Sequence, residues 1–366
     1  TSPLSPTMRF VRLAAPSFED GALSSNSSLV WKPSGNINTS EYTPTYSLKI
    51  NNLDQTVSNG TSLSLEGLDA GTYTITVKAI GNEVKYLDSE ESLAISFRKI
   101  AAPQMSVDKD GYHWPNDSDA VSFTLEIDGV RVADALTVDG KNYSYKPRYT
   151  TKGEHIVKLT AVGNGVDTVS SDPYVYTQVA QFLTMPTIEY AYSSPYGYVD
   201  GGSVTVTVTS PDQNASGYLY DVYGASETST QTTFTKTIGA PGTVNIKVKT
   251  LGGTIDDNDI YYIDSVFTQT YSIVLLSAPN TDGFKFNGNG QFLWNTVQNA
   301  SGYDYQLSFD DGKSWQAQVH VGGNASNKIS NYADYETITI KVRASGSGSN
   351  KISSEWVTWT WDNPNK

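Results

Sequence analysis

Few side chains in this sequence could carry out acid–base or nucleophilic chemistry. There is no cysteine, and the three histidines are His113, His155 and His320. None of them has a nearby pattern of serine and carboxylate residues that would indicate a catalytic triad, although triad members need not be neighbours in sequence. His155 stands in a run that alternates apolar and polar residues, and His113 precedes a tryptophan expected in a core. We therefore predict strand-filling or surface histidines and no enzymatic activity.

Acidic turns could supply oxygen ligands to a hard cation. The densest group is Asp256, Asp257 and Asp259, in the run Asp-Asp-Asn-Asp. Carboxylate oxygens are the ligands that Ca²⁺ prefers, but the spacing is not that of a twelve-residue calcium loop. Two interpretations stay open, a calcium site at these three aspartates or an acidic, solvated turn. We expect no other cofactor.

Tyrosine is the aromatic residue in surplus, with 24 Tyr against 7 Trp and 11 Phe. Four of them, Tyr190, Tyr192, Tyr196 and Tyr198, lie within nine residues around a Pro/Gly turn. Strand alternation places Trp356 on an outward face. Exposed aromatic rings stack on sugars while amides and carboxylates bind hydroxyl groups, so these five residues are candidate ligands of a polysaccharide or oligosaccharide. The alternative is that tyrosine simply fills strands.

One segment matches a named turn motif. Residues Ser308 to Trp315 fit the Asp-box pattern Ser-x-Asp-x-Gly-x-Ser/Thr-Trp, which is found in sialidases and other β-propellers. A sialidase would carry several such boxes and an arginine cluster, whereas this chain has a single box. We predict a structural hairpin in which Asp310 caps backbone N–H groups and Trp315 packs over the turn.

Two sequence markers recur four times in step. The first is an apolar-Pro tetrad whose prolines, Pro16, Pro103, Pro186 and Pro279, lie 87, 83 and 93 residues apart. The second alternates apolar and polar residues, as a half-buried strand does. It spans residues 71–81, 153–163, 242–252 and 336–346. Both markers indicate a repeated unit of about 90 residues.

Six or seven short strands per unit, without a helical period, predict antiparallel two-sheet sandwiches. We expect an all-β chain of four tandem β-sandwich domains in an elongated array. The predicted segments are a linker at 1–11 and sandwiches at 12–100, 101–183, 184–276 and 277–366. Each proline tetrad would mark a linker and an edge strand, where a missing N–H costs least. Trp31, Trp114 and Trp294 occupy the equivalent strand and are expected in cores.

Charge and hydropathy exclude two classes of partner. The net charge is −13, with 25 Lys and Arg against 38 Asp and Glu, which argues against binding of nucleic acid phosphates. No run of 18 apolar residues could span a membrane. The first seven residues lack the features of a signal peptide and read as a linker within a longer protein. We expect a monomer.

The sequence resembles fibronectin type III or immunoglobulin-like repeats of Gram-positive bacterial surface proteins, such as secreted starch-adherence and polysaccharide-degrading proteins of gut Firmicutes. The resemblance is carried by Trp31, Trp294, Ala215–Tyr218, Ala300–Tyr303 and Gly71–Ala79. It implies an extracellular location, secreted or on the cell surface, and a non-catalytic segment that binds carbohydrate, with α-glucan or starch as the leading ligand. Other domains of a larger surface protein would be its partners. The alternative is a structural spacer or adhesin stalk with no glycan site.

Overall fold

The computed structural model describes residues 8–24, 27–132, 137–139 and 141–366. Of the predicted linker, residues 1–7 lie outside the described residues. The chain divides into two compact units, residues 1–181 with 255–261, and residues 182–254 with 262–366. The segments 12–100, 101–183, 184–276 and 277–366 are the first to fourth repeats.

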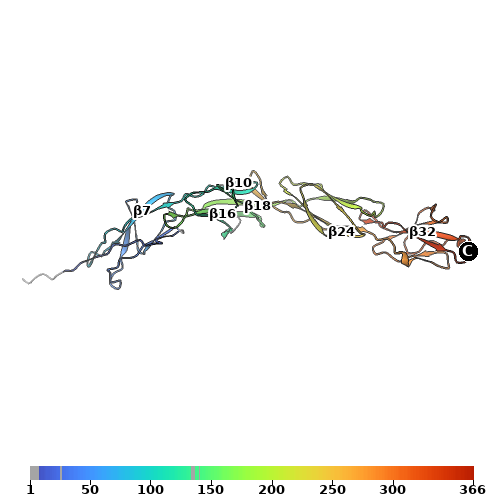
Figure 1. Cartoon of the computed structure of the whole chain (residues 1–366), viewed down its shortest axis with the longest axis horizontal. Helices are drawn as coiled ribbons and strands as arrows, with labels where there is room; N and C mark the ends of the chain where they lie inside the picture. Colours follow the sequence, from blue (N-terminus) through green and yellow to red (C-terminus); the bar gives the residue numbers. More distant parts are fainter. Residues whose placement is uncertain (1–7, 25–26, 133–136, 140) are drawn as a thin grey trace, which may run out of the picture. The chain divides into compact units, whose positions relative to one another are not determined.

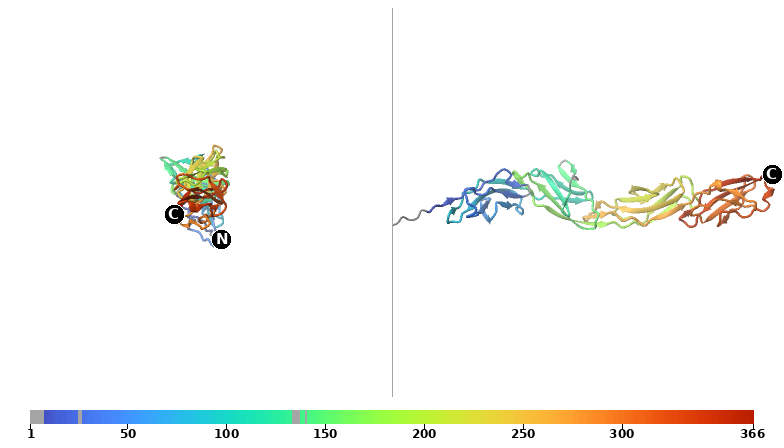
Figure 2. Two further views of the ribbon diagram at one scale, coloured as in Figure 1. Left: turned by 90° about the vertical axis from the view of Figure 1, so that its right-hand side faces the viewer. Right: turned by 90° about the horizontal axis from the view of Figure 1, so that it is seen from below.

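The prediction of an all-β chain is confirmed (Figure 1). The described residues form short strands and two 3₁₀ turns, η1 (Thr281–Gly283) and η2 (Tyr332–Asp334). The two further views in Figure 2 show strands joined by loops and no helical layer in the part of the chain that the structure describes.

The first repeat, in the first unit, is a two-sheet sandwich. Its strands are β1 (Val11–Arg12), β2 (Leu23–Ser24), β3 (Ser28–Val30), β4 (Thr45–Ile50), β5 (Leu53–Ser58), β6 (Ser62–Ser64), β7 (Gly71–Ile80), β8 (Tyr86–Leu87) and β9 (Ile95–Lys99). One sheet has the order β2-β3-β6, and the other contains β9-β7-β4-β5. The short strands β1 and β8 pair in parallel beside them.

The second repeat has the same arrangement. Its strands are β10 (Ser106–Asp108), β11 (Gly111–Pro115), β12 (Ser122–Ile127), β13 (Val130–Arg131), β14 (Thr137–Asp139), β15 (Asn142–Tyr145), β16 (Gly153–Val162), β17 (Thr168–Val169) and β18 (Tyr174–Phe182). The sheet β10-β11-β15-β14 faces one that contains β13-β12-β16-β18.

The third repeat, which lies in the second unit except for residues 255–261, again pairs two sheets. Its strands are β19 (Ile188–Tyr192), β20 (Ser203–Val208), β21 (Gly217–Val222), β22 (Ala225–Ser229), β23 (Thr233–Thr237), β24 (Gly242–Leu251), β25 (Thr254–Ile255), β26 (Ile260–Ile263) and β27 (Tyr271–Leu275). The sheets contain β19-β20-β23 and β22-β21-β24-β27.

The fourth repeat has a smaller first sheet. Its strands are β28 (Lys285–Phe286), β29 (Phe292–Leu293), β30 (Gly302–Ser308), β31 (Val319–Val321), β32 (Thr337–Ser345), β33 (Lys351–Ile352) and β34 (Val357–Asp362). The pair β28-β29 faces β31-β30-β32-β34.

The alternating sequence marker forms an interior strand of the second sheet named for each repeat, namely β7, β16, β24 and β32. Alternation buries one side of each of these strands, as Ile75, Val77 and Ala79 show in β7, where all three are fully buried. The expected core tryptophans are also confirmed, because Trp31, Trp114 and Trp294 are at most 3% exposed.

Candidate functional site

The proline tetrads begin with a buried apolar residue whose backbone makes the same contact in every repeat. These residues are Leu13, Ile100, Leu183 and Leu276. The N–H of each donates to a carbonyl oxygen in a short strand later in the chain. For Leu13 the acceptor lies in the same repeat, whereas for the other three it lies in the repeat that follows. The four bonds are Leu13 to Leu87 at 3.0 Å, Ile100 to Val169 at 3.2 Å, Leu183 to Ile263 at 2.9 Å and Leu276 to Ile352 at 3.0 Å. The tetrad is therefore part of the sandwich rather than a free linker.

Within the first unit, the last strand of the first repeat also serves the second repeat. Lys99 in β9 pairs antiparallel with Gly71 in β7 and parallel with Val169 in β17. The Val169 side chain is fully buried and belongs to the core of the first repeat. The two repeats thus share a strand, and the second repeat contributes one aliphatic side chain to the core of the first.

The second unit repeats this junction. Leu275 in β27 pairs antiparallel with Gly242 in β24 and parallel with Ile352 in β33. Ile352 is 5% exposed and belongs to the core of the third repeat. We call this arrangement, a shared strand plus one inserted side chain, the shared-strand junction.

Two polar residues directly follow each of these acceptor carbonyl groups. Their side chains accept hydrogen bonds from backbone N–H groups at the end of the alternating strand. We call the pair the latch; its four copies are Asp88-Ser89, Ser170-Ser171, Asp264-Ser265 and Ser353-Ser354. The second residue accepts a backbone N–H bond in each case, as Ser171 Oγ does from Ala161 at 3.0 Å and Ser354 Oγ from Ala344 at 2.9 Å. The first accepts from the glycine that ends the marker, as Ser353 Oγ does from Gly346 at 3.0 Å. Sequence reasoning missed the latch.

The four predicted stacking tyrosines lie in different environments. Tyr192 and Tyr198 are 8% and 7% exposed, belong to the core of the third repeat and stack on each other with ring centroids 6.5 Å apart. Tyr190 is half-buried against Tyr271, at 5.4 Å. Tyr196 alone among the four is open to solvent, with 82% of the residue exposed. Tyr192 and Tyr198 therefore do not present the open rings expected of stacking residues, because both rings lie in the core. The backbone N–H of Tyr198 also donates to Ser353 O at 2.7 Å. Sugar binding by these tyrosines stays a prediction.

The fifth predicted residue, Trp356, is half-buried under two cations of the fourth repeat. Arg343 Cζ lies 4.8 Å from the centroid of its ring and Lys341 Nζ lies 5.2 Å away, with the same ammonium 4.4 Å from Trp315. Such contacts attract a cation to the ring face. Arg343 Nη1 also donates to Tyr196 O at 2.7 Å. The structure thus connects the Tyr196 loop to Trp356 through one arginine.

Arg343 is held in place by a buried carboxylate. Its Nε donates to Asp304 Oδ2 at 2.9 Å, and Asp304 is 5% exposed. The other oxygen of Asp304 lies 2.9 Å from Nδ1 of His320, whose side chain is 57% exposed. An open tyrosine, a half-buried tryptophan and this polar group make a surface that could bind hydroxyl-rich ligands.

The predicted calcium loop forms a turn through its own backbone. Asp256 Oδ1 accepts the N–H groups of Asn258 and Ile260, each at 3.0 Å, while Asp257 and Asp259 are exposed. Across the residues that the structure describes, no group of three or more His, Asp or Glu side chains is placed to hold one metal ion. Calcium binding at these aspartates stays a prediction.

The Asp-box forms the predicted hairpin. Asp310 accepts the backbone N–H of Ser314 at 2.8 Å and the Ser314 hydroxyl at 2.6 Å, and Ser308 Oγ lies 2.7 Å away. The bonds from Ser314, with the one from Ser308, lower the pKa of Asp310 to about 2. The carboxylate is therefore occupied within its own turn.

Two tyrosines of the second repeat, Tyr143 and Tyr149, pack against other aromatic rings. Tyr149 is 7% exposed and stacks on His155 with centroids 4.2 Å apart. Tyr143 stacks on Trp114 at 6.0 Å. Most of the surplus tyrosine therefore packs against other aromatic rings.

Comparisons with known proteins found only distant structural likeness. No protein-family model and no curated protein sequence matches the chain. One similar solved structure is the FN1–FN3 segment of chicken CNTN1, with 12% identity, a TM-score of 0.22 and coverage of 72% of this chain and 97% of that one. Another is the central fibronectin-III array of RIM-binding protein, with 15% identity, a TM-score of 0.17 and coverage of 75% and 100%. Superpositions this loose carry no argument, so the description of the repeats as β-sandwiches rests on the strand order of the chain itself. No helix in the described ranges is long and apolar enough to cross a membrane.

Proposed function

We propose that this chain is a spacer within a larger extracellular protein, built from sandwiches joined by shared strands. The shared-strand junction carries the proposal. In both units the final strand of one repeat is bonded on its other edge to the next repeat, and an aliphatic side chain of that next repeat is buried in the preceding core. A joint of this kind lacks the free linker residues that would let two domains move independently.

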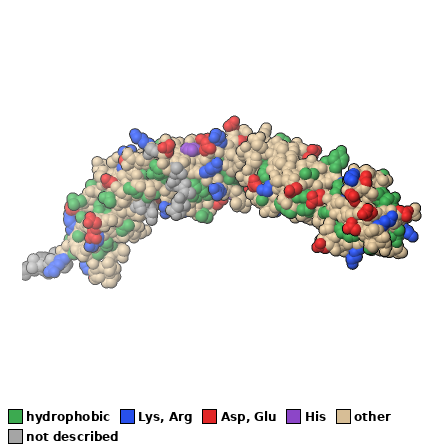
Figure 3. Space-filling view, turned by 45° about the vertical axis from the view of Figure 1, so that its right-hand side comes forward, with side chains coloured by type: hydrophobic (Ala, Val, Ile, Leu, Met, Phe, Trp, Pro, Cys, Tyr) green, Lys and Arg blue, Asp and Glu red, His purple; other side chains and the backbone are tan. Residues whose placement is uncertain are grey.

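The surface supports a spacer role. Lys and Arg side chains are intermingled with Asp and Glu over the face drawn in Figure 3, without a single concentrated patch of either sign. The large exposed apolar residues are spread along the chain, as Leu53, Val84, Val166 and Val266 illustrate. Isolated apolar side chains are ordinary features of a protein surface and need no partner.

The proposal is tested by measuring distances across one junction in the full chain. The sequence has no cysteine, so spin labels can be placed cleanly at Ser62→Cys and Lys158→Cys in the first unit, both on exposed strand positions. A second sample carries labels at Ser226→Cys and Thr358→Cys in the second unit. We expect double electron–electron resonance to give a single narrow distance distribution for each pair of labels. A broad distribution in the unmutated background would refute the spacer proposal.

Variants of the inserted side chains sharpen this test. Val169→Ser and Ile352→Ser remove the aliphatic contact at the first and second unit's junction respectively, and each should broaden only the distribution of its own unit. The matched control is Val175→Ser, at a position that is 54% exposed in the second repeat, which should change neither distribution.

A second proposed function is carbohydrate binding at the surface formed by Tyr196, Arg343 and Trp356. It is favoured by the open Tyr196 ring and by the bond from Arg343 to the Tyr196 carbonyl oxygen. Affinity electrophoresis through gels that contain soluble starch or another neutral glycan tests it. Tyr196→Ala and Trp356→Ala should abolish retardation, whereas Tyr174→Ala in the second repeat should not. Unretarded migration of the wild-type chain in every glycan contradicts this proposal and leaves the spacer proposal intact.

A further inference from the structure

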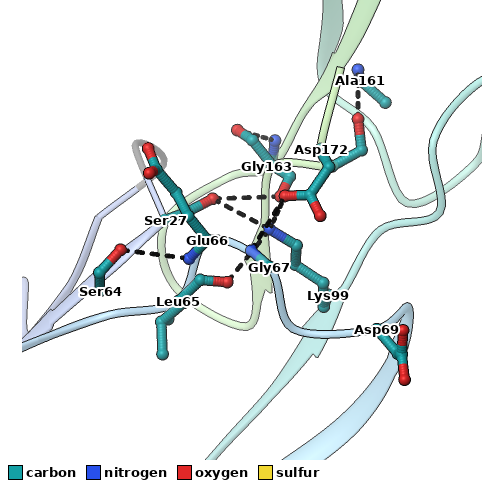
Figure 4. Close-up of polar contacts among 12 residues, drawn as sticks. Ser27, Ser64, Leu65, Glu66, Gly67, Asp69, Lys99, Ala161, Gly163 and Asp172 are labelled. Carbon is teal, nitrogen blue, oxygen red and sulfur yellow. Dashed lines mark hydrogen bonds and ion pairs between the residues drawn. The ribbon is translucent and has the colours of Figure 1, made fainter. Parts of the chain in front are cut away.

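The junction of the first unit contains a lysine ammonium with no access to solvent. Lys99 is 1% exposed and is the last residue of β9, the strand that both repeats share. Its Nζ lies 3.0 Å from Asp172 Oδ1, 3.3 Å from Leu65 O and 3.5 Å from Ser27 Oγ, as Figure 4 shows. An ammonium has three N–H donors and no acceptor, so these three oxygen atoms match its full bonding capacity.

The oxygen atoms around Lys99 come from both repeats. Leu65 and Ser27 belong to the first repeat, whereas Asp172 follows β17 in the second. Two further hydrogen bonds join the two repeats beside Lys99. Ser27 Oγ donates to Ser170 O at 3.2 Å, and Gly67 N donates to Asp172 Oδ1 at 3.5 Å (Figure 4). The cluster is complete only when the second repeat is docked in this one orientation.

The second unit supplies an internal comparison. Leu275 has the same two strand partners as Lys99, with Gly242 in place of Gly71 and Ile352 in place of Val169. It is also 1% exposed. A plain aliphatic side chain therefore suffices to close a shared-strand junction, and the lysine is not required for burial.

The positive charge of Lys99 must then contribute something other than a net gain in folding free energy. Removing an ammonium from water is costly, and a buried ion pair is often no more stabilising than well-packed apolar residues of similar size. What the ion pair adds is direction, because Nζ meets its acceptors at fixed distances, whereas an aliphatic contact tolerates small rotations.

We propose that Lys99 and Asp172 are positioning residues that fix the orientation of the second repeat on the first. This inference rests on the proposed spacer function and adds to it that the two junctions differ in kind. The junction in the first unit is set by a directional polar cluster, and the one in the second unit by apolar packing.

The test measures distances in the full chain with the Ser62→Cys and Lys158→Cys labels. The informative variants are Lys99→Leu, which copies Leu275, and Asp172→Asn, which keeps the shape of the side chain. We expect both to shift or broaden the distance distribution while the thermal unfolding midpoint of Lys99→Leu is unchanged or raised. The matched control is Lys78→Leu, which breaks the Lys78–Asp88 pair inside the first repeat and should leave the distribution as in the wild type.

Each result decides between the two proposals. A narrow wild-type distribution that Lys99→Leu and Asp172→Asn leave in place, with or without a lower unfolding midpoint, overturns the positioning role and keeps the spacer proposal. A broad wild-type distribution overturns the spacer proposal, and the inference that rests on it. If Lys99→Leu does not fold, Asp172→Asn decides alone, because Asp172 has a side chain that is 46% exposed and its amide tolerates solvent.

Discussion

Nδ1 of His155 lies 2.7 Å from Oδ2 of Asp128, while the other ring nitrogen lies 2.9 Å from the carbonyl oxygen of Thr151. Both partners can only accept hydrogen bonds, so the geometry fits an imidazolium that donates from both nitrogens. Burial opposes the charge and lowers the pKa, but the bonds to Asp128 and Thr151 outweigh it, and the pKa of His155 is raised above 6.5. The same contact lowers the pKa of Asp128.

These shifts predict that the second repeat becomes less stable as the solution becomes alkaline. A histidine whose pKa is raised in the folded state contributes its full stabilisation below the unfolded pKa of about 6.5 and loses it as the pH rises through the folded value. Asp128 acts in the opposite sense, and its contribution is lost as the pH falls through its lowered pKa. Hydrogen exchange of β16 amides as a function of pH, corrected for the intrinsic rate, measures the effect.

The control for this prediction is His155→Gln, in which the alkaline loss of protection should disappear, together with His113→Gln, in which it should persist. His113 contacts Asp108 through one nitrogen at 2.9 Å and is partly exposed. Identical pH dependence in the wild type and His155→Gln would show that the charged pair has no influence on stability.

Removing a single hydroxyl group of the latch should lower the free energy of unfolding substantially. Ser171→Ala leaves the buried N–H of Ala161 without its acceptor, and an unsatisfied buried donor costs about 1–3 kcal/mol of unfolding free energy. Chemical denaturation of the full chain, followed in the second repeat by hydrogen exchange, measures it. Ser118→Ala, at an exposed position of the same repeat, is the matched control and should be neutral. Equal stability of the two variants would contradict the role of the latch.

The repeat architecture could be predicted because its signals are local. Strand alternation and the recurring proline depend only on neighbouring residues, so β7, β16, β24 and β32 match the expected segments. The latch is partly visible as well, since its first residue follows the marker glycine by seven positions in three repeats, as Ser353 follows Gly346. In the third repeat a longer loop separates Gly252 from Asp264 and hides the pattern.

The environment of individual side chains could not be predicted, because it depends on distant segments. Tyr190 and Tyr192 lie on the same face of β19 as Ile188, and the sequence does not reveal that Ile188 anchors this face to the core. Lys99 looks like a surface residue in sequence, and its burial depends on Asp172 in the following repeat. The bond from Arg343 to the Tyr196 carbonyl likewise joins residues 147 positions apart.

Truncating two neighbouring tyrosines should have very different effects on the free energy of unfolding, a large loss at Tyr192 and almost none at Tyr196. Tyr192→Ala removes a core ring whose hydroxyl also donates to Val199 O at 3.0 Å, and loss of a buried aromatic side chain costs about 3–5 kcal/mol. Tyr196→Ala, at a position that is 82% exposed, should change the unfolding free energy by less than about 0.5 kcal/mol. Urea denaturation of the two variants in the full chain provides the comparison. A destabilised Tyr196→Ala would mean that its ring packs on the protein in solution.

The glycine that ends each alternating marker is expected to resist any side chain. In the fourth repeat a Cβ at Gly346 would lie 2.1 Å from the carbonyl oxygen of Lys351, which is backbone and cannot swing aside. Gly346→Ala should therefore push Lys351 and the rest of β33 away from Gly346, disrupt the bond from Leu276 to Ile352, and cost at least about 1–3 kcal/mol. Gly322→Ala is the matched control in the same repeat, since a Cβ there meets no atom within 4 Å. Because β33 also pairs with β27, Gly346→Ala should broaden the distance distribution between labels at Ser226→Cys and Thr358→Cys. If the two alanine variants unfold at the same denaturant concentration, close backbone approach at Gly346 does not determine the junction.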